Sequence, residues 1–264
     1  MPIPSTPITS ILNNTVEEEV YNLLVQYYSP IYHDGVRDYV NIFMAVDPMI
    51  SRFLYLESVV GDEKIHQNAK ILISGCGVGS EHIVARYFGF GEVYGVEVDE
   101  FLVDACKKRL EYLPDMHTSY YNGDYLPYAE NQFHFVVSGH VIEHTRDPVQ
   151  YLRECMRVLL PNGYLSLEFP NRYHRIELHT RLPSFEWLPR PLRNVCLRLI
   201  SSQVSPLSDS VKIRYQSIIG TNLQQISMAG IKRILRQNGQ PFDILNRIEA
   251  APGIIRCVIQ KRPR

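Results

Sequence analysis

The chain of 264 residues has few cysteines, a single tryptophan and no long apolar run. Its cysteines are odd in number, widely spaced and without a CxxC pattern, which indicates reduced thiols and argues against a disulfide framework or a zinc finger. No apolar run approaches the ~18 residues of a membrane span, and MPIPSTPITS at the N-terminus lacks the features of a secretion signal. We therefore expect a soluble, cytoplasmic protein. The cysteines are Cys76, Cys106, Cys155, Cys196 and Cys257.

Charge is divided unevenly along the chain. Residues 1–150 carry a net charge of −12 and residues 151–264 a net charge of +11, although the total is only −1. The two parts could neutralise each other by packing together, or the basic part could attract an anionic group or an anionic membrane surface. Because the overall balance is not basic and no RNA-recognition module is visible, nucleic acid is not an expected partner.

A glycine-rich turn is the most informative feature that is present. In KILISGCGVG (70–79), Gly75, Gly77 and Gly79 follow a short apolar run, and Glu97 ends the next apolar run. A buried strand that leads into such a turn can bring backbone N–H groups close to a nucleotide, while an acidic residue ~20 positions later accepts the ribose hydroxyls. The spacing predicts a nucleotide site.

The blocks that follow the turn resemble a class I S-adenosylmethionine (SAM) dependent methyltransferase of the broad small-molecule group. GCGVG, GVE, GDYLPY, HVIEH, RDP and RVLLPNG carry the resemblance, over about residues 70–171. It implies an α/β fold with a doubly wound, mostly parallel seven-stranded sheet (Rossmann-like), and SAM as the cofactor.

The resemblance also implies roles for individual residues. The turn would line the methionine and ribose parts of SAM, Glu97 would accept the ribose hydroxyls, and Val98 would pack on adenine. Asp124 and Tyr125 would meet the adenine amino group and ring. The full implied cofactor set is Gly75, Cys76, Gly77, Gly79, Glu97, Val98, Asp124, Tyr125 and Ser138.

Three positions depart from the family pattern. Ile73 stands where an acidic residue usually precedes the turn, so one contact to the methionine end must come from elsewhere or from water. His134 replaces the Asp that usually opens the fourth strand, and Asn162 replaces a glycine of the usual PGG. Asn tolerates left-handed turns, so this last change should be neutral.

We expect four regions: a helical cap (1–69), the SAM-binding core (70–171), a lid insertion (172–221), and a helix with a strand hairpin completing the core (222–264). Thr15 and Glu18 form a capping-box pattern that predicts a helix start. An aromatic group around a predicted break at Ser29–Pro30 either packs this helix on the core or covers the SAM methyl group. A second amphipathic helix is expected over 222–238.

The predicted lid is longer than a usual loop, which favours a functional role in acceptor binding. It contains His174, Glu177 and His179 just beyond a strand end, then Trp187 and a helical apolar face. Arginines in the same segment favour an acceptor that is a small molecule with an anionic or amphipathic character, and contact with a membrane surface through the lid. The oligomeric state is not written in the sequence. The apolar face would comprise Leu192, Val195, Leu199 and Ile200.

Methyl transfer to a hydroxyl needs alignment and removal of a proton, a task that histidine suits near neutral pH. His140, at the end of the fourth predicted strand, is the first candidate base, although it could instead cap the next helix. His174 and His179 follow, with Glu177 as an orienting partner. We expect oxygen as the acceptor atom, then nitrogen, then carbon.

Other functions fit parts of the sequence. HVIEH (140–144) matches the HxxEH metal pattern, so a metal-assisted enzyme is an alternative, although we expect no metal. A SAM-binding module without turnover is a second alternative, for which Ile73 is the only hint. The glycine turn alone would also suit a nicotinamide dehydrogenase, against which GDYLPY and HVIEH argue.

Overall fold

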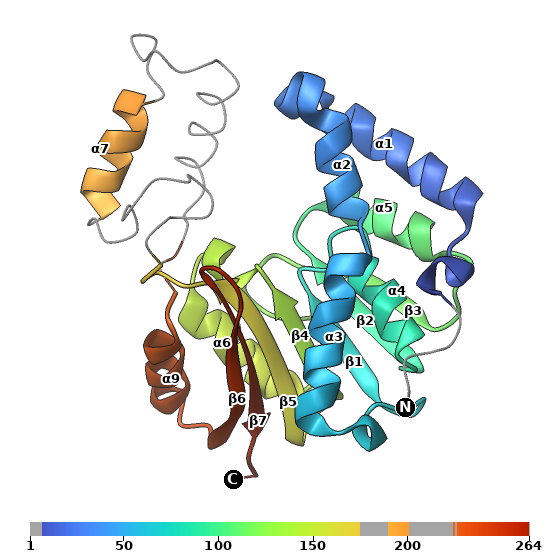
Figure 1. The fold of residues 1–264 in the computed structure, drawn as a ribbon. Coiled ribbons are helices and arrows are strands. Elements are labelled where there is room, and N and C mark those ends of the chain that lie inside the picture. Colours follow the sequence, from blue (N-terminus) through green and yellow to red (C-terminus); the bar gives the residue numbers. More distant parts are fainter. Residues whose placement is uncertain (1–6, 175–189, 201–223, 225, 264) are drawn as a thin grey trace.

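The computed structural model describes residues 7–174, 190–200, 224 and 226–263, and its centre is one seven-stranded sheet (Figure 1). The strand order is β3-β2-β1-β4-β5-β7-β6. Neighbours from β3 to β5 run parallel, whereas β7 is antiparallel to both β5 and β6. This confirms the predicted fold class and the C-terminal hairpin. The strands are β1 (Lys70–Ser74), β2 (Glu92–Glu97), β3 (Met116–Tyr120), β4 (Phe133–Gly139), β5 (Leu159–Pro170), β6 (Phe242–Ala251) and β7 (Ile254–Lys261).

Helices cover both faces of the sheet. On one face α3 and α4 pack over β1 and β4, in a core that includes Phe53, Ile73 and Phe135. On the other face α6 and α9 lie over β4, β5 and β7, in a core around Leu152 and Ile231. The α-helices are α1 (Asn14–Tyr32), α2 (Val36–Met44), α3 (Asp47–Val60), α4 (Ser80–Tyr87), α5 (Glu100–Leu110), α6 (Pro148–Val158), α7 (Arg190–Ile200) and α9 (Met228–Gln237). Short 3-10 helices are η1 (Ile8–Ile11), η2 (His33–Gly35), η3 (Asp62–Lys64) and η4 (Ile142–His144).

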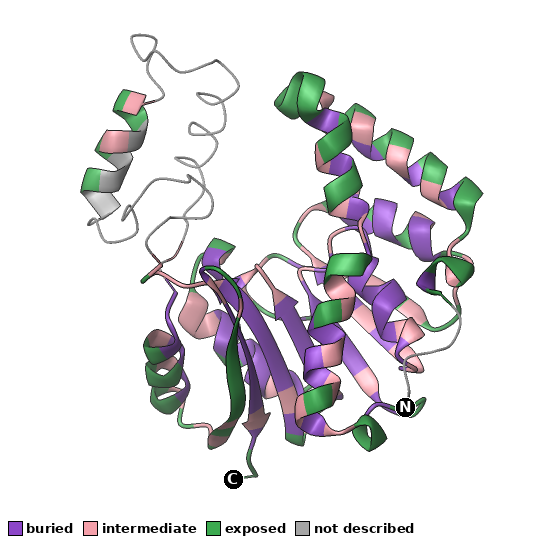
Figure 2. Ribbon diagram, viewed as in Figure 1, coloured by how far each residue is buried: buried purple, intermediate pink, exposed green. Residues whose placement is uncertain are grey.

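The central strands have the continuous apolar sequences that burial on both faces requires. In β1 every residue after Lys70 is buried, and β4 is buried at five of its seven positions (Figure 2). Parallel strands read this way because helices exclude water from both sides of the sheet. The carboxyl ends of β1, β2 and β4 therefore lie side by side, where this fold class binds ligands.

The predicted helical cap consists of α1, α2 and α3. Val20, Leu24 and Val40 are fully buried in a core that α1 and α2 share with α5. The aromatic rings form a cluster in which Tyr28 and Tyr39 are 4.9 Å apart between ring centroids, and Tyr39 and Phe43 are 5.7 Å apart. The rings thus pack on one another, and the ring of Phe43 lies beside the glycine turn, because a Cβ on Gly77 would be 3.2 Å from it. Both interpretations of the aromatic group, packing and a cover over the SAM methyl group, stay predictions.

The start and course of α1 differ from the predictions. Asn13 is the N-cap, and its side chain accepts hydrogen bonds from the backbone N–H groups of Thr15 and Val16 at 3.2 and 3.4 Å. The capping box at Thr15 was therefore wrong by two residues. The predicted break at Ser29–Pro30 was also wrong, because Pro30 lies inside the helix. The packing of α1 on α2 and α5 compensates for the missing N–H.

We expect Asn13→Ala to lower the free energy of unfolding by about 0.5–2 kcal/mol, because the mutation leaves two N–H groups of α1 without their cap. Thr15→Ala should change it much less, since this side chain is not the cap. Urea unfolding of the two variants measures the difference. Equal losses would contradict the assignment of the cap.

At the C-terminal end, α9 begins later than predicted. The hydroxyl of Ser227 accepts a hydrogen bond from the N–H of Gly230 at 3.1 Å and caps the helix, so Gln224 and Ile226 precede it. In α7, Leu192, Val195 and Leu199 are 53%, 53% and 67% exposed, on the predicted apolar face. Within the described residues, no helix is both long enough and apolar enough to cross a bilayer.

Candidate functional site

The glycine turn joins β1 to α4 with a backbone that glycine favours. Gly75, Gly77 and Gly79 have φ angles of 72°, 50° and 84°. A Cβ on Gly75 would lie 2.3 Å from a methyl group of Val141, so the turn also passes close to the segment after β4. The N–H groups of Gly75 and Cys76 donate to the carbonyl of Val96, which ties the turn to the end of β2.

Glu97 ends β2 directly beside this turn. One oxygen of its carboxylate accepts a hydrogen bond from the N–H of Gly77 at 3.0 Å, and the other accepts from its neighbour Val98 at 2.7 Å. Each carboxylate oxygen has a second lone pair. The carboxylate is therefore held in a fixed orientation at the mouth of the turn, where it can accept hydrogen bonds from the two hydroxyls of a diol.

An apolar surface adjoins Glu97. Val98 is 53% exposed and Tyr125 67% exposed, and a Cβ on Gly123 would lie 3.7 Å from a methyl of Val98. Asn122 accepts a hydrogen bond from the N–H of Asp124 at 3.0 Å, which shapes the loop after β3. The exposed side chain of Val98 beside the half-buried carboxylate of Glu97 is suited to contact with an apolar ring.

Ser138 has other partners than those implied. It is fully buried in β4, and Tyr151 of α6 lies with its hydroxyl 2.7 Å from Ser138 Oγ and 2.9 Å from Ser74 Oγ. Burial raises the pKa of Tyr151, so its proton stays on the phenol. Tyr151 thus fastens the ends of β1 and β4 together beneath the turn, a role that sequence reasoning missed.

His140 follows β4 in a left-handed conformation, with φ of 57°. Its Nε2 lies 3.2 Å from Glu168 on β5, and its Nδ1 lies 3.3 Å from the buried carboxylate of Glu143. Burial lowers the pKa of His140, but hydrogen bonds and charges from these two carboxylates outweigh burial and raise it to about 9. At neutral pH the ring is therefore charged.

Glu168 lies at the centre of a buried charged network. Its oxygens accept from Arg52 of α3 at 2.6 Å and from Arg256 of β7 at 2.5 Å, and Arg52 also pairs with Glu81 of α4. Burial raises the pKa of Glu168, but the hydrogen bond from His140 and the charges of the arginines hold it well below its usual range. A Cβ on Gly139 would lie 2.3 Å from the guanidinium carbon of Arg52, so only glycine permits this approach.

Comparison with known proteins shows what the region around the site is similar to. A family model described as a methyltransferase domain matches residues 72–167. A probable SAM-dependent methyltransferase from Mycolicibacterium smegmatis is 35% identical over 106 residues, which are 39% of this chain and 38% of that protein. Residues 72–167 therefore carry a methyltransferase domain that is similar to those of SAM-dependent methyltransferases.

Other relatives agree with this assignment. A demethylmenaquinone methyltransferase from Lactobacillus johnsonii is 24% identical over 72% of this chain and 75% of its own. The fold matches that of a SAM-dependent methyltransferase from Aquifex aeolicus with a TM-score of 0.54 at 13% identity, covering 92% of this chain and 97% of that one. The chain spans 29%, 38% and 48% of the length of three curated relatives that it matches, the M. smegmatis protein among them. The match to a methyltransferase domain argues against the dehydrogenase alternative.

The two candidate histidines that the structure describes, His140 and His174, have different surroundings. The ring of His174 lies against the turn between β6 and β7, because a Cβ on Gly253 would come within 2.5 Å of it. His140 lies at the end of β4. His179, Glu177, Trp187 and most of the predicted lid lie outside the described residues.

The HVIEH segment does not bring its three ligand-type side chains together in the manner of the HxxEH pattern. His140 and Glu143 are in contact, but His144 is exposed, and the segment forms η4 where that pattern requires an α-helix. In addition, the carboxylate of Glu168, which contacts His140, is already paired with Arg52 and Arg256, so its charge is neutralised.

Arg52, Glu168 and Arg256 were not predicted as site residues. A charged residue inside an otherwise apolar strand was the available indication, as in YLSLEFP around Glu168 and GIIRCVIQ around Arg256. Burial of a charge is costly unless it is paired, so such a residue demands a partner of opposite sign. The sequence could not show which partner, because Glu168 and Arg256 are 88 positions apart.

Proposed function

We propose that the chain transfers a methyl group from SAM to a small-molecule acceptor. The observation that carries this proposal is the carboxylate of Glu97, which is oriented by two backbone N–H groups at the mouth of the glycine turn. Bound SAM would supply an electrophilic methyl on a sulfonium. The residues of the chain then have to hold the cofactor, bring an acceptor atom into line with the methyl group, and manage the acceptor's proton.

The cofactor-binding residues fall into groups according to the part of SAM that each would contact. Glu97 would accept the ribose hydroxyls, and the turn from Gly75 to Gly79 would leave room for the methionine part. The exposed surfaces of Val98 and Tyr125 would enclose adenine, with Asp124 accepting from its amino group. Ser138 would act behind this surface, through its contact with Tyr151.

For the acceptor we propose a hydroxyl group, with His140 as the base. The base must be neutral to take a proton, and the carboxylates of Glu143 and Glu168 keep this ring charged below a pKa of about 9. Only about one ring in a hundred is then neutral at pH 7. Methyl transfer that depends on this form should therefore be slow at neutral pH.

We expect log kcat/KM to rise by one unit per pH unit between about pH 7 and 8.5, and to level off near pH 9, where His140 loses its proton. The measurement is initial rate at low acceptor concentration, with a buffer series of constant ionic strength. His140→Gln should remove the dependence and leave a low, flat profile. A wild-type rate that is flat from pH 6 to 9 would contradict the role of His140 as base.

The charged ring also favours a second candidate, an acceptor that is already ionised. An imidazolium can pair with a phenolate or enolate, and the negative charge then activates the acceptor without a base. Relatives named as demethylmenaquinone and 2-phytyl-1,4-naphthoquinone methyltransferases support a ring acceptor with an apolar substituent. In that case the rate would fall as pH rises through 9.

Transfer of labelled methyl groups from SAM to a panel of phenols, naphthoquinols, carboxylates and amines tests the proposal. We expect labelled product from phenols or naphthoquinols, and mass spectrometry with NMR would distinguish a methyl on oxygen from one on ring carbon. Labelled product from amines alone would support the N-methyltransferase alternative. If SAM binds but no member of the panel, including cell extract, takes up label, the protein is a SAM-binding module.

A further inference from the structure

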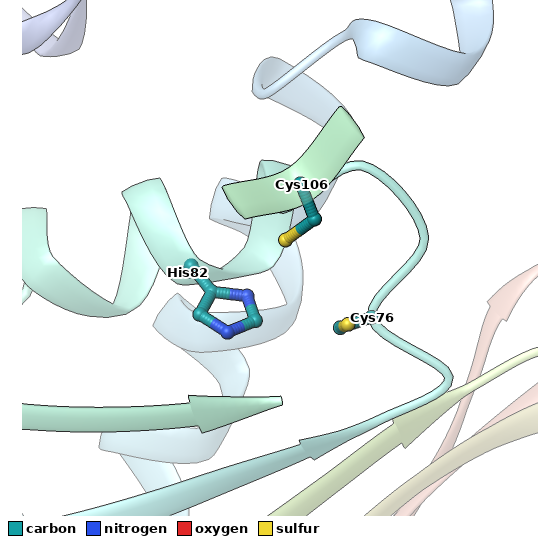
Figure 3. A group of neighbouring side chains, drawn as sticks. All are labelled: Cys76, His82 and Cys106. Carbon is teal, nitrogen blue, oxygen red and sulfur yellow. The ribbon is translucent and has the colours of Figure 1, made fainter. Parts of the chain in front are cut away.

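Three side chains from separate segments meet behind the glycine turn. Cys76 lies in the turn, His82 in the first turns of α4 and Cys106 in α5, and all three are buried. Figure 3 shows the thiol of Cys106 pointing toward the imidazole of His82, with Cys76 on the neighbouring turn. Their ligand atoms lie within 4.8 Å of one another. The proposed methyl transfer has no use for the side chains of His82 and Cys106.

His82 has the orientation of a metal-binding histidine. Its Nε2 faces the backbone carbonyl of His117 at 3.5 Å, while its buried Nδ1 has no hydrogen-bond partner among the residues that the structure describes. A proton on Nε2 that faces a carbonyl leaves a free lone pair on Nδ1, and metal-ligating histidines are commonly held in this way. In Figure 3, Nδ1 is the ring nitrogen on the side of the two sulfurs.

The His82 ring packs against β2 at a position where only a glycine leaves room for it. A Cβ on Gly95 of β2 would lie 2.2 Å from Cε1 of His82 and 2.9 Å from Cβ of Cys76. An unpartnered acceptor nitrogen at a fully buried position is costly, which a ligand on that nitrogen would remedy.

The distances suit a small cation. Zinc binds thiolate sulfur at about 2.3 Å and imidazole nitrogen at about 2.0 Å, which in a tetrahedral site places two sulfurs about 3.8 Å apart. The observed limit of 4.8 Å therefore requires a closure of at most about 1 Å. Two thiolates and one imidazole are soft ligands, of the kind that select Zn²⁺ and Cu⁺ over Mg²⁺ or Ca²⁺.

We propose that Cys76, His82 and Cys106 bind one thiolate-preferring d¹⁰ cation, Zn²⁺ or Cu⁺, behind the glycine turn. Two metal–sulfur bonds form as the two thiols release their protons, and Nδ1 contributes the third ligand. With Zn²⁺ the two thiolates balance the charge of the ion, which suits a buried position. The ion would tie the cofactor turn to α4 and α5, and it enters when the turn opens or while the chain folds.

Metal retention by reduced protein tests the proposal without reference to SAM or activity. After treatment with a chelator and a reductant, the protein is loaded with Zn²⁺, with Cu⁺ or with Co²⁺ as a spectroscopic probe, both in the native state and during refolding. We expect one ion per chain after gel filtration, and thiolate-to-cobalt charge-transfer absorption with Co²⁺. Comparison of the Zn²⁺ and Cu⁺ arms shows which ion is preferred.

Matched variants locate the site. Cys106→Ala should weaken retention more than 100-fold, beyond the ~10–100-fold that loss of a second-shell partner causes. Cys155→Ala removes an equally buried thiol on α6 and should leave retention unchanged. Circular dichroism shows whether each variant is folded, and Cys106→Ser provides a second test that keeps a polar group near Thr118.

Two results would overturn the proposal. One is retention by Cys106→Ala and Cys106→Ser equal to that of the wild type. The other is that the wild type retains no ion, in either the native or the refolded state. This result would overturn the proposal whether Cys76 and Cys106 stay free thiols or form a disulfide on mild oxidation. Because neither result involves SAM, failure here is distinguishable from failure of the proposed methyl transfer.

Discussion

Replacing Glu97 with alanine should weaken SAM binding roughly 10- to 150-fold, since loss of a hydrogen bond to a charged group costs about 1.5–3 kcal/mol. The carboxylate is held in place by the N–H groups of Gly77 and Val98, so its orientation is set before the cofactor arrives. Isothermal titration calorimetry measures the change. Glu92→Ala is the matched control, because Glu92 opens the same strand and pairs with half-buried Lys70.

Gly77→Val should weaken SAM binding at least as much, for a different reason. The φ of 50° at Gly77 disfavours a β-branched residue, and its Cβ would lie 3.2 Å from the ring of Phe43. A thermal unfolding curve distinguishes loss of the site from loss of the fold. Both variants binding SAM with wild-type affinity would exclude the turn and Glu97 as the cofactor site.

His140→Ala should reduce kcat roughly 10²- to 10⁴-fold and leave SAM affinity nearly unchanged, the range of a positioned proton-transfer group. Because the mutation leaves the buried carboxylate of Glu143 without its neighbour, His140→Gln is needed as a second variant that keeps a polar side chain in contact. Single-turnover rates with saturating SAM measure the effect. His144→Ala, in the same segment but exposed, is the control and should retain activity.

Chelator treatment distinguishes this account from a metal-assisted reaction at HVIEH. We expect EDTA to change the wild-type rate little. Abolition of activity by EDTA, restored by Mg²⁺ and lost again in both His140→Gln and His144→Ala, would assign a metal to this segment. A metal ion bound by Cys76 and Cys106 would behave differently, because Mg²⁺ does not replace a thiolate-preferring ion.

Local sequence patterns predicted the parts of the molecule that depend on local geometry. The apolar run of β1 followed by Gly75 and Gly77 dictates a buried strand and a tight turn, and the position of Glu97 follows from the length of one helix and one strand. The hairpin at the C-terminus was predicted for a similar reason, from two strand patterns around Pro252 and Gly253. The four-region division of the chain stays a prediction.

Long-range pairings could not be predicted in this way. Arg52 reaches Glu168 across 116 positions, and the charged state of His140 follows from its contacts with the carboxylates of Glu143 and Glu168. Nor does the spacing of Cys76 and Cys106 resemble a metal motif, because their proximity arises from the packing of α5 against the turn.

The predictions of helix ends were wrong where two sequence signals competed. Asn13 and Thr15 are both good N-cap residues, and the choice between them depends on how α1 meets α2 and α5. Pro30 normally indicates a break, but one lost hydrogen bond is small against the burial of Val20 and Leu24 on the same helix.

Calorimetric titration of the wild-type protein with SAM measures directly whether the glycine turn and Glu97 form a SAM site. We expect saturable binding of one SAM per chain, with no comparable binding of NAD. Absence of SAM binding by folded protein, or NAD bound in its place, would show that the site is not a SAM site.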